Sequence, residues 1–288
     1  MTVARTPAEL PEARRAAAIG TFDGVHKGHR RVLDAARAGG LRPTVVTFDP
    51  HPRIAFGSPV ELLVPLQRRI ELLQEAGMED VLVLHFDEEL AALSPDAFAE
   101  DVLRAAGIEC IAAGDGFRFG TGRSGDLGTL EQLGFDVRRV PLVDNVSSSH
   151  IRSLLAAGEV AQAASLLGRP AEVEGIVVHG DHRGRLLGFP TANLDTPPGV
   201  LVPKLGIYAG HALDRRAAIS IGTNPTYGGT ERRAEAHLLD FDGDLYGRRL
   251  IVELWEHLRD EVRYTTEQAL VDQIAADCAK TRLVDRPG

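Results

Sequence analysis

Apolar runs and amphipathic segments alternate along the first half of the chain. The runs at 16–19 and 81–84 are apolar without interruption, which is typical of strands covered on both faces. The segment at 66–76 carries apolar residues at helical spacing and stops at Gly77, as many helices do. This alternation predicts an α/β fold in which a parallel sheet lies between helices.

Further elements continue the same order. Strands are expected at 44–48, 111–113 and 135–140, and helices at 30–36, 94–107 and 127–133. In such sheets ligands bind at the carboxyl ends of the strands. Three loops of this chain fall at such ends, at 20–29, 49–52 and 114–122. We therefore expect a ligand site among these loops.

After Pro170 the pattern changes to short strands divided by Gly, Pro and Asp turns. Their connections are too short for helical crossovers, so the pattern predicts antiparallel pairing and a small barrel with a helix at 266–280. The boundary is placed near Gly168, which gives domains of 1–168 and 169–288. Helices are expected before this boundary at 147–157 and 160–167. Strands are expected after it at 173–178, 206–209, 217–221, 234–239 and 250–254.

Composition excludes several classes of protein. Hydrophobic residues make up 44% and charged residues 25% of the 288 residues, as in an ordinary globular protein. A net charge of −9 argues against a broad nucleic-acid or membrane surface. Cys110 and Cys278 form no metal or redox motif, which suits a reducing cytosol. We expect a cytoplasmic protein with small-molecule partners, present as a monomer or a weak homo-oligomer.

The loop after the first apolar run is typical of a phosphate site. It reads Gly-Thr-Phe-Asp-Gly-Val-His-Lys-Gly-His over 20–29 and leads into a helix. A strand, a glycine-bearing turn and a helix N-terminus aim N–H groups and the helix dipole at one anion. His26 and His29 can lie on one side of the first turn and donate to phosphate oxygens. The alternative, a metal pair, lacks a third ligand at a usual spacing. We interpret the loop as a nucleoside triphosphate site.

A second loop, at 180–193, contains glycines and arginines that suit phosphate binding. Thr191 and Asn193 are two residues apart, so on an extended segment both side chains face one way. A hydroxyl and an amide oxygen on one face can ligate Mg²⁺. The alternative is a flexible hairpin followed by an edge strand, and composition does not decide between the two.

Glu235 is a candidate general base. Alternation places Glu235, His237 and Leu239 on one face of a strand, and Leu239 is expected to line the barrel. A carboxylate on that face can accept a proton during catalysis. Spacing alone favours the alternative, a solvated charge on an outward face.

Taken together, the motifs resemble those of the bacterial bifunctional riboflavin kinase/FMN adenylyltransferases, also called FAD synthetases. The similarity covers nearly everything from residue 19 to about residue 277. In the first half it is carried by 20–29, by Phe-Asp-Pro-His-Pro at 48–52, by 117–120 and by 147–152; in the second half by 184–193 and by Asp-Leu-Tyr-Gly at 244–247.

The resemblance implies a Rossmann-like nucleotidyltransferase domain that adenylylates FMN. On this resemblance, His26 and His29 would hold ATP phosphates as the FMN phosphate attacks the α-phosphorus. Gly116 stands where relatives usually carry a polar side chain beside the flavin, so the resemblance implies either weaker FMN binding or a looser loop. The remaining ATP contacts would be Gly20, Phe22, Asp23, Gly24, Ser148 and Arg152, and the flavin contacts Asp49, His51, Asp115 and Phe117.

For the second domain the resemblance implies a riboflavin kinase barrel with a terminal helix. Thr191 and Asn193 would hold Mg²⁺ and ATP phosphate, and Glu235 would accept the proton of the riboflavin 5′-hydroxyl. ATP, riboflavin and FMN are the implied substrates. Two alternatives stay open: a riboflavin kinase with a weak or inactive adenylyltransferase domain, and a flavin- or nucleotide-binding regulator without turnover. The other implied kinase contacts with ATP are Gly180, Gly184, Arg185 and Gly188.

Overall fold

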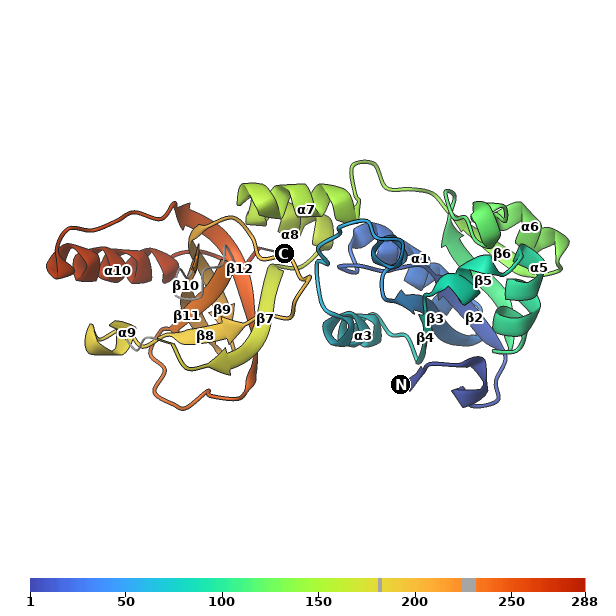
Figure 1. The fold of residues 1–288 in the computed structure, drawn as a ribbon, viewed down its shortest axis with the longest axis horizontal. Coiled ribbons are helices and arrows are strands. Elements are labelled where there is room, and N and C mark those ends of the chain that lie inside the picture. The colour runs from blue at the N-terminus through green and yellow to red at the C-terminus, as the bar shows by residue number, and fades with distance from the viewer. Residues whose placement is uncertain (181–182, 224–231, 288) are drawn as a thin grey trace. The chain divides into compact units, whose positions relative to one another are not determined.

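A computed structural model describes residues 1–180, 183–223 and 232–287 (Figure 1). The chain forms two compact units, Met1–Ser147 and Ser148–Gly288. Helices α7 (Ser148–Ala157) and α8 (Val160–Leu167) pack against each other and belong to the second unit. The domain boundary expected near residue 168 is a separate division and remains a prediction.

The first unit is built on a six-stranded sheet whose neighbouring strands are all parallel. The strand order is β1-β4-β3-β2-β5-β6, so the winding direction reverses at β2. A crevice for ligands opens at the carboxyl ends of the strands beside such a reversal. The strands are β1 (Thr2–Ala4), β2 (Arg15–Ile19), β3 (Arg42–Asp49), β4 (Asp80–His85), β5 (Ile108–Gly114) and β6 (Asp136–Val140).

Helices cover both faces of this sheet, as the alternation predicts. Helices α1 (Lys27–Arg37) and α3 (Leu66–Glu75) share one buried apolar cluster with one face of the sheet. Helix α5 (Pro95–Phe98), the π-helical turns at Ala99–Arg104 and α6 (Leu127–Gln132) share another cluster with the opposite face.

Short elements escaped the sequence analysis. The strand β1 and the helices α2 (Pro52–Ala55) and α4 (Glu88–Ala92) each span at most five residues. Segments of this length contain too few residues to display a hydrophobic period. The 3₁₀ turns Pro7–Glu9 and Thr121–Arg123 were not expected for the same reason.

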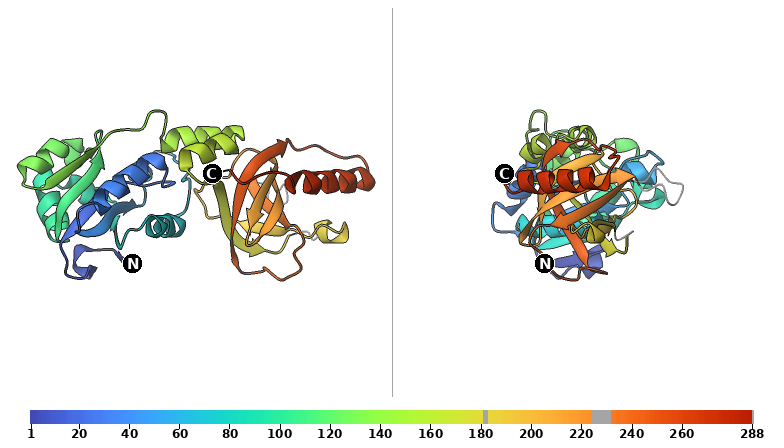
Figure 2. Two further views of the ribbon diagram at one scale, coloured as in Figure 1. Left: turned by 180° about the vertical axis from the view of Figure 1, so that it is seen from behind. Right: turned by 90° about the vertical axis from the view of Figure 1, so that its left-hand side faces the viewer.

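The second unit is a closed antiparallel barrel, which confirms the expected architecture. Its strand order is β10-β11-β8-β7-β12-β9, so β8 is an internal strand and not an edge strand. Helix α9 (Arg183–Leu186) precedes β8, and α10 (Glu267–Thr281) packs against β9 and β10 (Figure 2). The strands are β7 (Ala171–Val178), β8 (Ala192–Asp195), β9 (Gly206–Ala212), β10 (Arg215–Thr223), β11 (Arg232–Leu238) and β12 (Arg249–Arg259).

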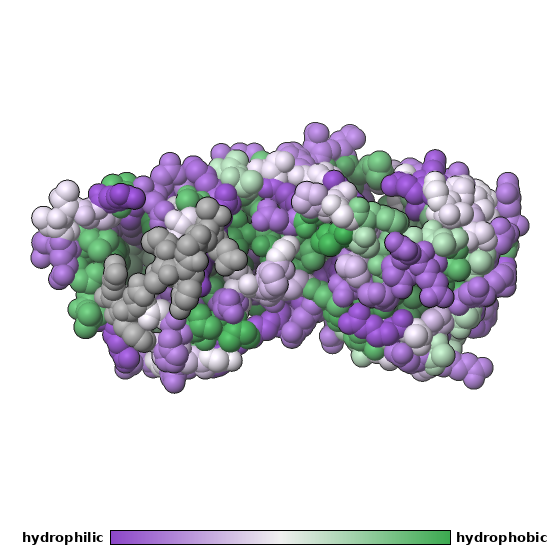
Figure 3. Space-filling view, in the orientation of Figure 1, coloured by the Kyte–Doolittle hydropathy of each residue, from purple (hydrophilic) through white to green (hydrophobic). Residues whose placement is uncertain are grey.

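The surface is mixed in character. Hydrophilic residues occupy much of the face shown in Figure 3, with hydrophobic residues visible between them. Large apolar side chains that are well exposed include Leu142, Leu186 and Leu283. Within the described ranges, none of the helices is long and apolar enough to cross a membrane.

Candidate active sites

The loop that joins β2 to α1 is tightly wound. Phe22, Gly24 and Val25 all have positive φ, at 50°, 81° and 42°. Phe22 nevertheless buries its ring almost completely and lies edge-on to the His29 ring, with centroids 5.2 Å apart. Burial of an aromatic ring offsets the strain of such a backbone conformation. The loop is therefore a fixed platform at the N-terminus of α1.

His26 and His29 lie together as the spacing predicts. His26 is the N-cap of α1, and its Nδ1 accepts a hydrogen bond from the His29 N–H at 3.2 Å. The two rings stack with centroids 3.6 Å apart and an interplanar angle of 13°. Burial, the neighbouring His26 and the charge of Arg69 hold the pKa of His29 well below its usual value. A neutral imidazole can donate one hydrogen bond to an anion.

Two expected ATP contacts have partners within the protein. The Asp23 carboxylate is buried and accepts a hydrogen bond from the Leu63 N–H at 2.9 Å. The Gly20 N–H donates to the Val46 carbonyl at 3.1 Å, which continues the sheet pairing. These bonds hold the start and the middle of the loop in place, and direct contact with ATP remains a prediction for both residues.

The expected flavin contacts follow β3 and β5, the two neighbours of β2 in the sheet. Asp49 ends β3, and His51 caps α2 by accepting a hydrogen bond from the Arg53 N–H at 3.1 Å. Asp115 is exposed directly after β5. Phe117 is partly buried and stacks on Phe119, with centroids 5.7 Å apart. Their topology brings these loops to the same edge of the sheet as the paired histidines.

Ser148 and Arg152 lie one turn apart on α7, which begins at Ser148. Residues four apart on a helix share a face, so one ligand can reach both side chains. The helix belongs to the second compact unit. Their contact with the triphosphate therefore remains a prediction of the resemblance.

The loops after β2, β3 and β5 together form the first candidate site. Arg69, a buried arginine beside this site, was not expected from the sequence. Its side chain is 2% exposed, and it donates to the carbonyls of Thr21 at 2.8 Å and Phe48 at 3.1 Å. An arginine on a helix that carries several charged residues gives no sign of burial. Only its position relative to the ends of the strands distinguishes Arg69 from Arg68, the preceding residue.

The barrel brings Thr191, Asn193 and Glu235 together. Asn193 lies directly opposite Glu235 in the β8–β11 register, and the Thr191 hydroxyl donates to the Glu235 carboxylate at 3.3 Å. The shared orientation of Thr191 and Asn193 follows from their spacing. The hydroxyl and the carboxylate are thus in contact, and Asn193 lies beside them on the neighbouring strand.

Glu235 lies on the outward face that spacing alone favours, and not on the barrel-lining face that the general-base hypothesis assumed. Ala234, Ala236 and Leu238 alternate with it and are the buried residues of β11. Leu239 is buried as well, but it follows the end of the strand and no longer shares its alternation. Glu235 therefore projects from the outer face, where it contacts the segment that leads into β8.

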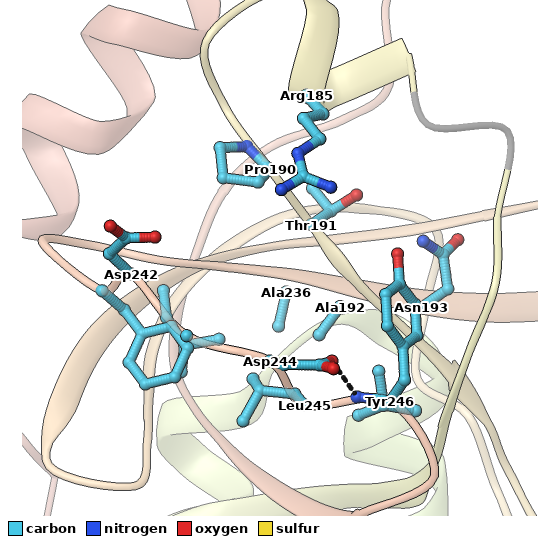
Figure 4. A pocket seen from close by; sticks show the side chains of 14 residues that line it. Arg185, Pro190, Thr191, Ala192, Asn193, Ala236, Asp242, Asp244, Leu245 and Tyr246 are labelled. Atoms are coloured by element: carbon cyan, nitrogen blue, oxygen red, sulfur yellow. Dashed lines mark hydrogen bonds between the residues drawn. The ribbon is translucent and has the colours of Figure 1, made fainter.

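A cavity of about 510 Å³ opens beside this cluster. That volume lies within the roughly 300–1,000 Å³ of small-ligand sites. In Figure 4, Arg185 and Thr191 lie on one side and Asp244 with Tyr246 on the other. The Tyr246 N–H donates to the Asp244 carboxylate at 2.9 Å. The cavity is lined by both polar and apolar side chains, and the apolar ones include Val177, Ala192, Ala236, Leu238 and Leu245.

The glycine- and arginine-bearing loop adjoins this cavity. A β-carbon on Gly180 would lie 2.5 Å from Nδ2 of Asn193, and one on Gly184 would lie 2.4 Å from the Phe189 carbonyl oxygen. Gly184 is required because the backbone approaches so closely, and at Gly180 a larger residue would displace the Asn193 side chain. Gly188 has a φ of 86°, and Arg185 lines the cavity. Residues 181–182 of the loop lie outside the described residues.

A parallel α/β unit with paired histidines after its central strand, together with a barrel bearing a threonine–asparagine–glutamate cluster, is the architecture of a two-part nucleotide-dependent transferase. The family model for riboflavin kinase matches residues 167–284, and the one for FAD synthetase matches residues 9–154. This chain belongs to the family of bifunctional riboflavin kinase/FMN adenylyltransferases.

Relatives with that family name cover almost the whole chain. The protein of Listeria monocytogenes is 33% identical over 96% of this chain and 94% of its own length. The protein of Escherichia coli is 37% identical over 93% of this chain and 92% of its own length. A crystal structure titled "Macrolide-efflux Protein from Streptococcus pneumoniae" superposes with a TM-score of 0.87 at 31% identity. The match covers 97% of this chain and 98% of that one.

Proposed function

We propose that this chain phosphorylates riboflavin to FMN in its barrel and adenylylates FMN to FAD in its parallel-sheet unit, with ATP as the donor in both steps. The observation that carries the kinase assignment is the contact of Thr191 with Glu235 opposite Asn193, beside a cavity of small-ligand size. The stacked imidazoles at the N-terminus of α1 support the adenylyltransferase assignment.

In the kinase step, Glu235 accepts the proton of the riboflavin 5′-hydroxyl as that oxygen attacks the γ-phosphorus of ATP. A new oxygen–phosphorus bond forms, the bond to the β–γ bridging oxygen breaks, and ADP leaves. Arg185 and the close-packed glycines at 180 and 184 face the phosphates. The protein mainly positions the reactants and stabilises charge in such a transfer.

Thr191 and Asn193 fit a magnesium ion. Both offer neutral oxygen donors from one face of an extended segment, and the Glu235 carboxylate lies next to Thr191. Sites for Mg²⁺ in phosphoryl transfer use few protein ligands and leave the remaining positions to water and substrate phosphates. When bound, the ion neutralises phosphate charge as the transfer proceeds.

In the adenylyl step, a phosphate oxygen of FMN attacks the α-phosphorus of ATP. A new phosphorus–oxygen bond forms, the bond from the α-phosphorus to the bridging oxygen breaks, and pyrophosphate leaves. His26 and His29 donate hydrogen bonds to the triphosphate where negative charge accumulates. The other proposed contacts are those of the resemblance: Gly20, Phe22, Asp23, Gly24, Ser148 and Arg152 at ATP, and Asp49, His51, Asp115 and Phe117 at the flavin.

Flavin products test this function directly. The purified chain is incubated with riboflavin, ATP and Mg²⁺, and the flavins are separated at several times. We expect FMN first and FAD afterwards, and FAD with pyrophosphate when FMN replaces riboflavin. Accumulation of FMN without FAD would restrict the chain to riboflavin kinase. The absence of both products, with flavin still bound, would leave a binding protein.

A further inference from the structure

The buried side chain of Arg69 joins two loops of the first site. Its Nη1 donates to the carbonyl of Thr21, in the loop after β2, and its Nη2 donates to the carbonyl of Phe48, near the end of β3. The side chain is 2% exposed, and its Nε has no partner among the residues that the structure describes. A buried guanidinium is costly unless it is held by several acceptors.

The surroundings of Arg69 connect both halves of that site. Its Nη2 lies 4.0 Å from the Asp49 carboxylate, at the turn expected to face the flavin. Burial lowers the pKa of Arg69. The Asp23 carboxylate, in the loop expected to hold ATP, raises this pKa, and the charge of Arg5 lowers it. Besides burial, His26 and Arg69 both lower the pKa of His29. One side chain therefore contacts the backbone of the loop expected to hold ATP and the end of the strand that leads to the expected flavin turn.

We infer that Arg69 is a positioning residue for adenylyl transfer: its two terminal nitrogens fix the paired imidazoles of the β2 loop relative to the Asp49 turn. The inference rests on the proposed adenylyltransferase function. In-line attack needs the FMN phosphate and the α-phosphorus in register, and a displacement of about 1 Å can cost on the order of a hundredfold in rate. Arg69 itself touches neither reactant in this assignment.

The neighbouring Arg68 supplies a matched control. It belongs to the same helix, but it pairs with the carboxylates of Glu71 at 3.3 Å and Glu75 at 2.8 Å along that helix. The barrel supplies a second control, because FMN formation from riboflavin in the same full-length variant reports an unrelated site. A loss confined to FAD formation therefore cannot come from a lower concentration of folded chain.

The experiment compares Arg69→Lys, Arg69→Met, Arg68→Lys and Arg68→Met with the wild-type chain. Lysine keeps the charge but offers one nitrogen in place of a planar pair. We expect kcat/KM for FAD formation to fall about tenfold in Arg69→Lys and on the order of a hundredfold in Arg69→Met. The Arg68 variants should stay near wild type, and all variants should form FMN normally.

A second measurement separates positioning from a merely structural role. The chemical shifts of the histidine NMR signals are followed against pH. The His29 signal is assigned as the one that is missing from the spectrum of the His29→Gln variant. Removing the positive charge should raise the pKa of His29 in Arg69→Met, whereas Arg69→Lys should leave it near the wild-type value. His26, which also faces His29, is unchanged in both variants.

The outcomes decide the inference in each case. Wild-type FAD kinetics and an unchanged His29 titration in Arg69→Met would overturn it. If Arg69→Met loses the native signals of the first unit, Arg69→Lys decides: wild-type FAD kinetics overturn the inference, and a loss confined to FAD formation supports it. A wild-type chain that forms no FAD would instead refute the proposed function.

Discussion

The hydroxyl of Thr191 donates a hydrogen bond to the carboxylate of Glu235 across 3.3 Å. This contact places a proposed magnesium ligand beside the proposed proton acceptor before any substrate arrives. It also fixes the carboxylate on the outer face of β11, next to the cavity and outside the barrel interior. The kinase chemistry is therefore expected at the rim of the barrel.

Replacement of Glu235 by Gln tests the proton acceptor. The amide keeps the shape of the side chain but cannot take the proton of the 5′-hydroxyl, so FMN formation should fall by about a hundredfold or more. Riboflavin binding, measured by fluorescence titration, should change little. Glu256→Gln on the exposed side of β12 is the matched control. Near-normal turnover in Glu235→Gln would remove this residue from its role.

Replacement of Thr191 by Val tests the magnesium site. Valine has nearly the same shape but provides neither a metal ligand nor the hydrogen bond to Glu235. We expect the Mg²⁺ concentration for half-maximal FMN formation to rise about tenfold. FAD formation from FMN serves as the internal control, because it takes place in the other unit. An unchanged Mg²⁺ dependence would contradict the assignment.

Replacement of Gly28 by Ala tests the fixed position of His26. A β-carbon at residue 28 would lie 3.2 Å from Cε1 and Nδ1 of the His26 ring, which would have to shift by a few tenths of an ångström. We expect the KM for ATP in FAD formation to rise about threefold to tenfold, because overpacking of this kind costs ~1 kcal/mol. The KM for ATP in FMN formation by the same variant is the control, because that step is assigned to the other unit. An unchanged KM for ATP in FAD formation would argue against a fixed position of His26.

The lowered pKa of His29 predicts a pH-dependent stability of the first unit. The pKa of His29 lies well below the ordinary 6.5 in the folded chain, so the unfolded chain binds the proton more readily. The stabilising effect is complete above about pH 6.5 and is lost as the pH falls from there towards the folded pKa. Thermal unfolding at pH 7.5 and 5.5 should show a larger drop for wild type than for His29→Gln. Parallel drops would place the pKa of His29 near its ordinary value.

Local spacing predicts part of each site, but not the residues that tertiary packing brings to it. His26 and His29 could be paired from their spacing, because the positions of side chains in one helical turn are local geometry. The shared face of Thr191 and Asn193 follows in the same way. Arg69 could not be found, because its burial depends on how α3 packs against the ends of β2 and β3, which lie far from it in the sequence.

Local sequence patterns are enough to predict the order of the longer elements, the parallel and antiparallel classes of the two units, and the motifs that identify the family. These features follow from local periodicity, turn residues and short spacings. Tertiary contacts add that Asn193 lies opposite Glu235 and that Arg69 joins the ends of two strands. Strand register and burial are set by contacts between distant segments, and no short window of sequence contains both partners of such a contact.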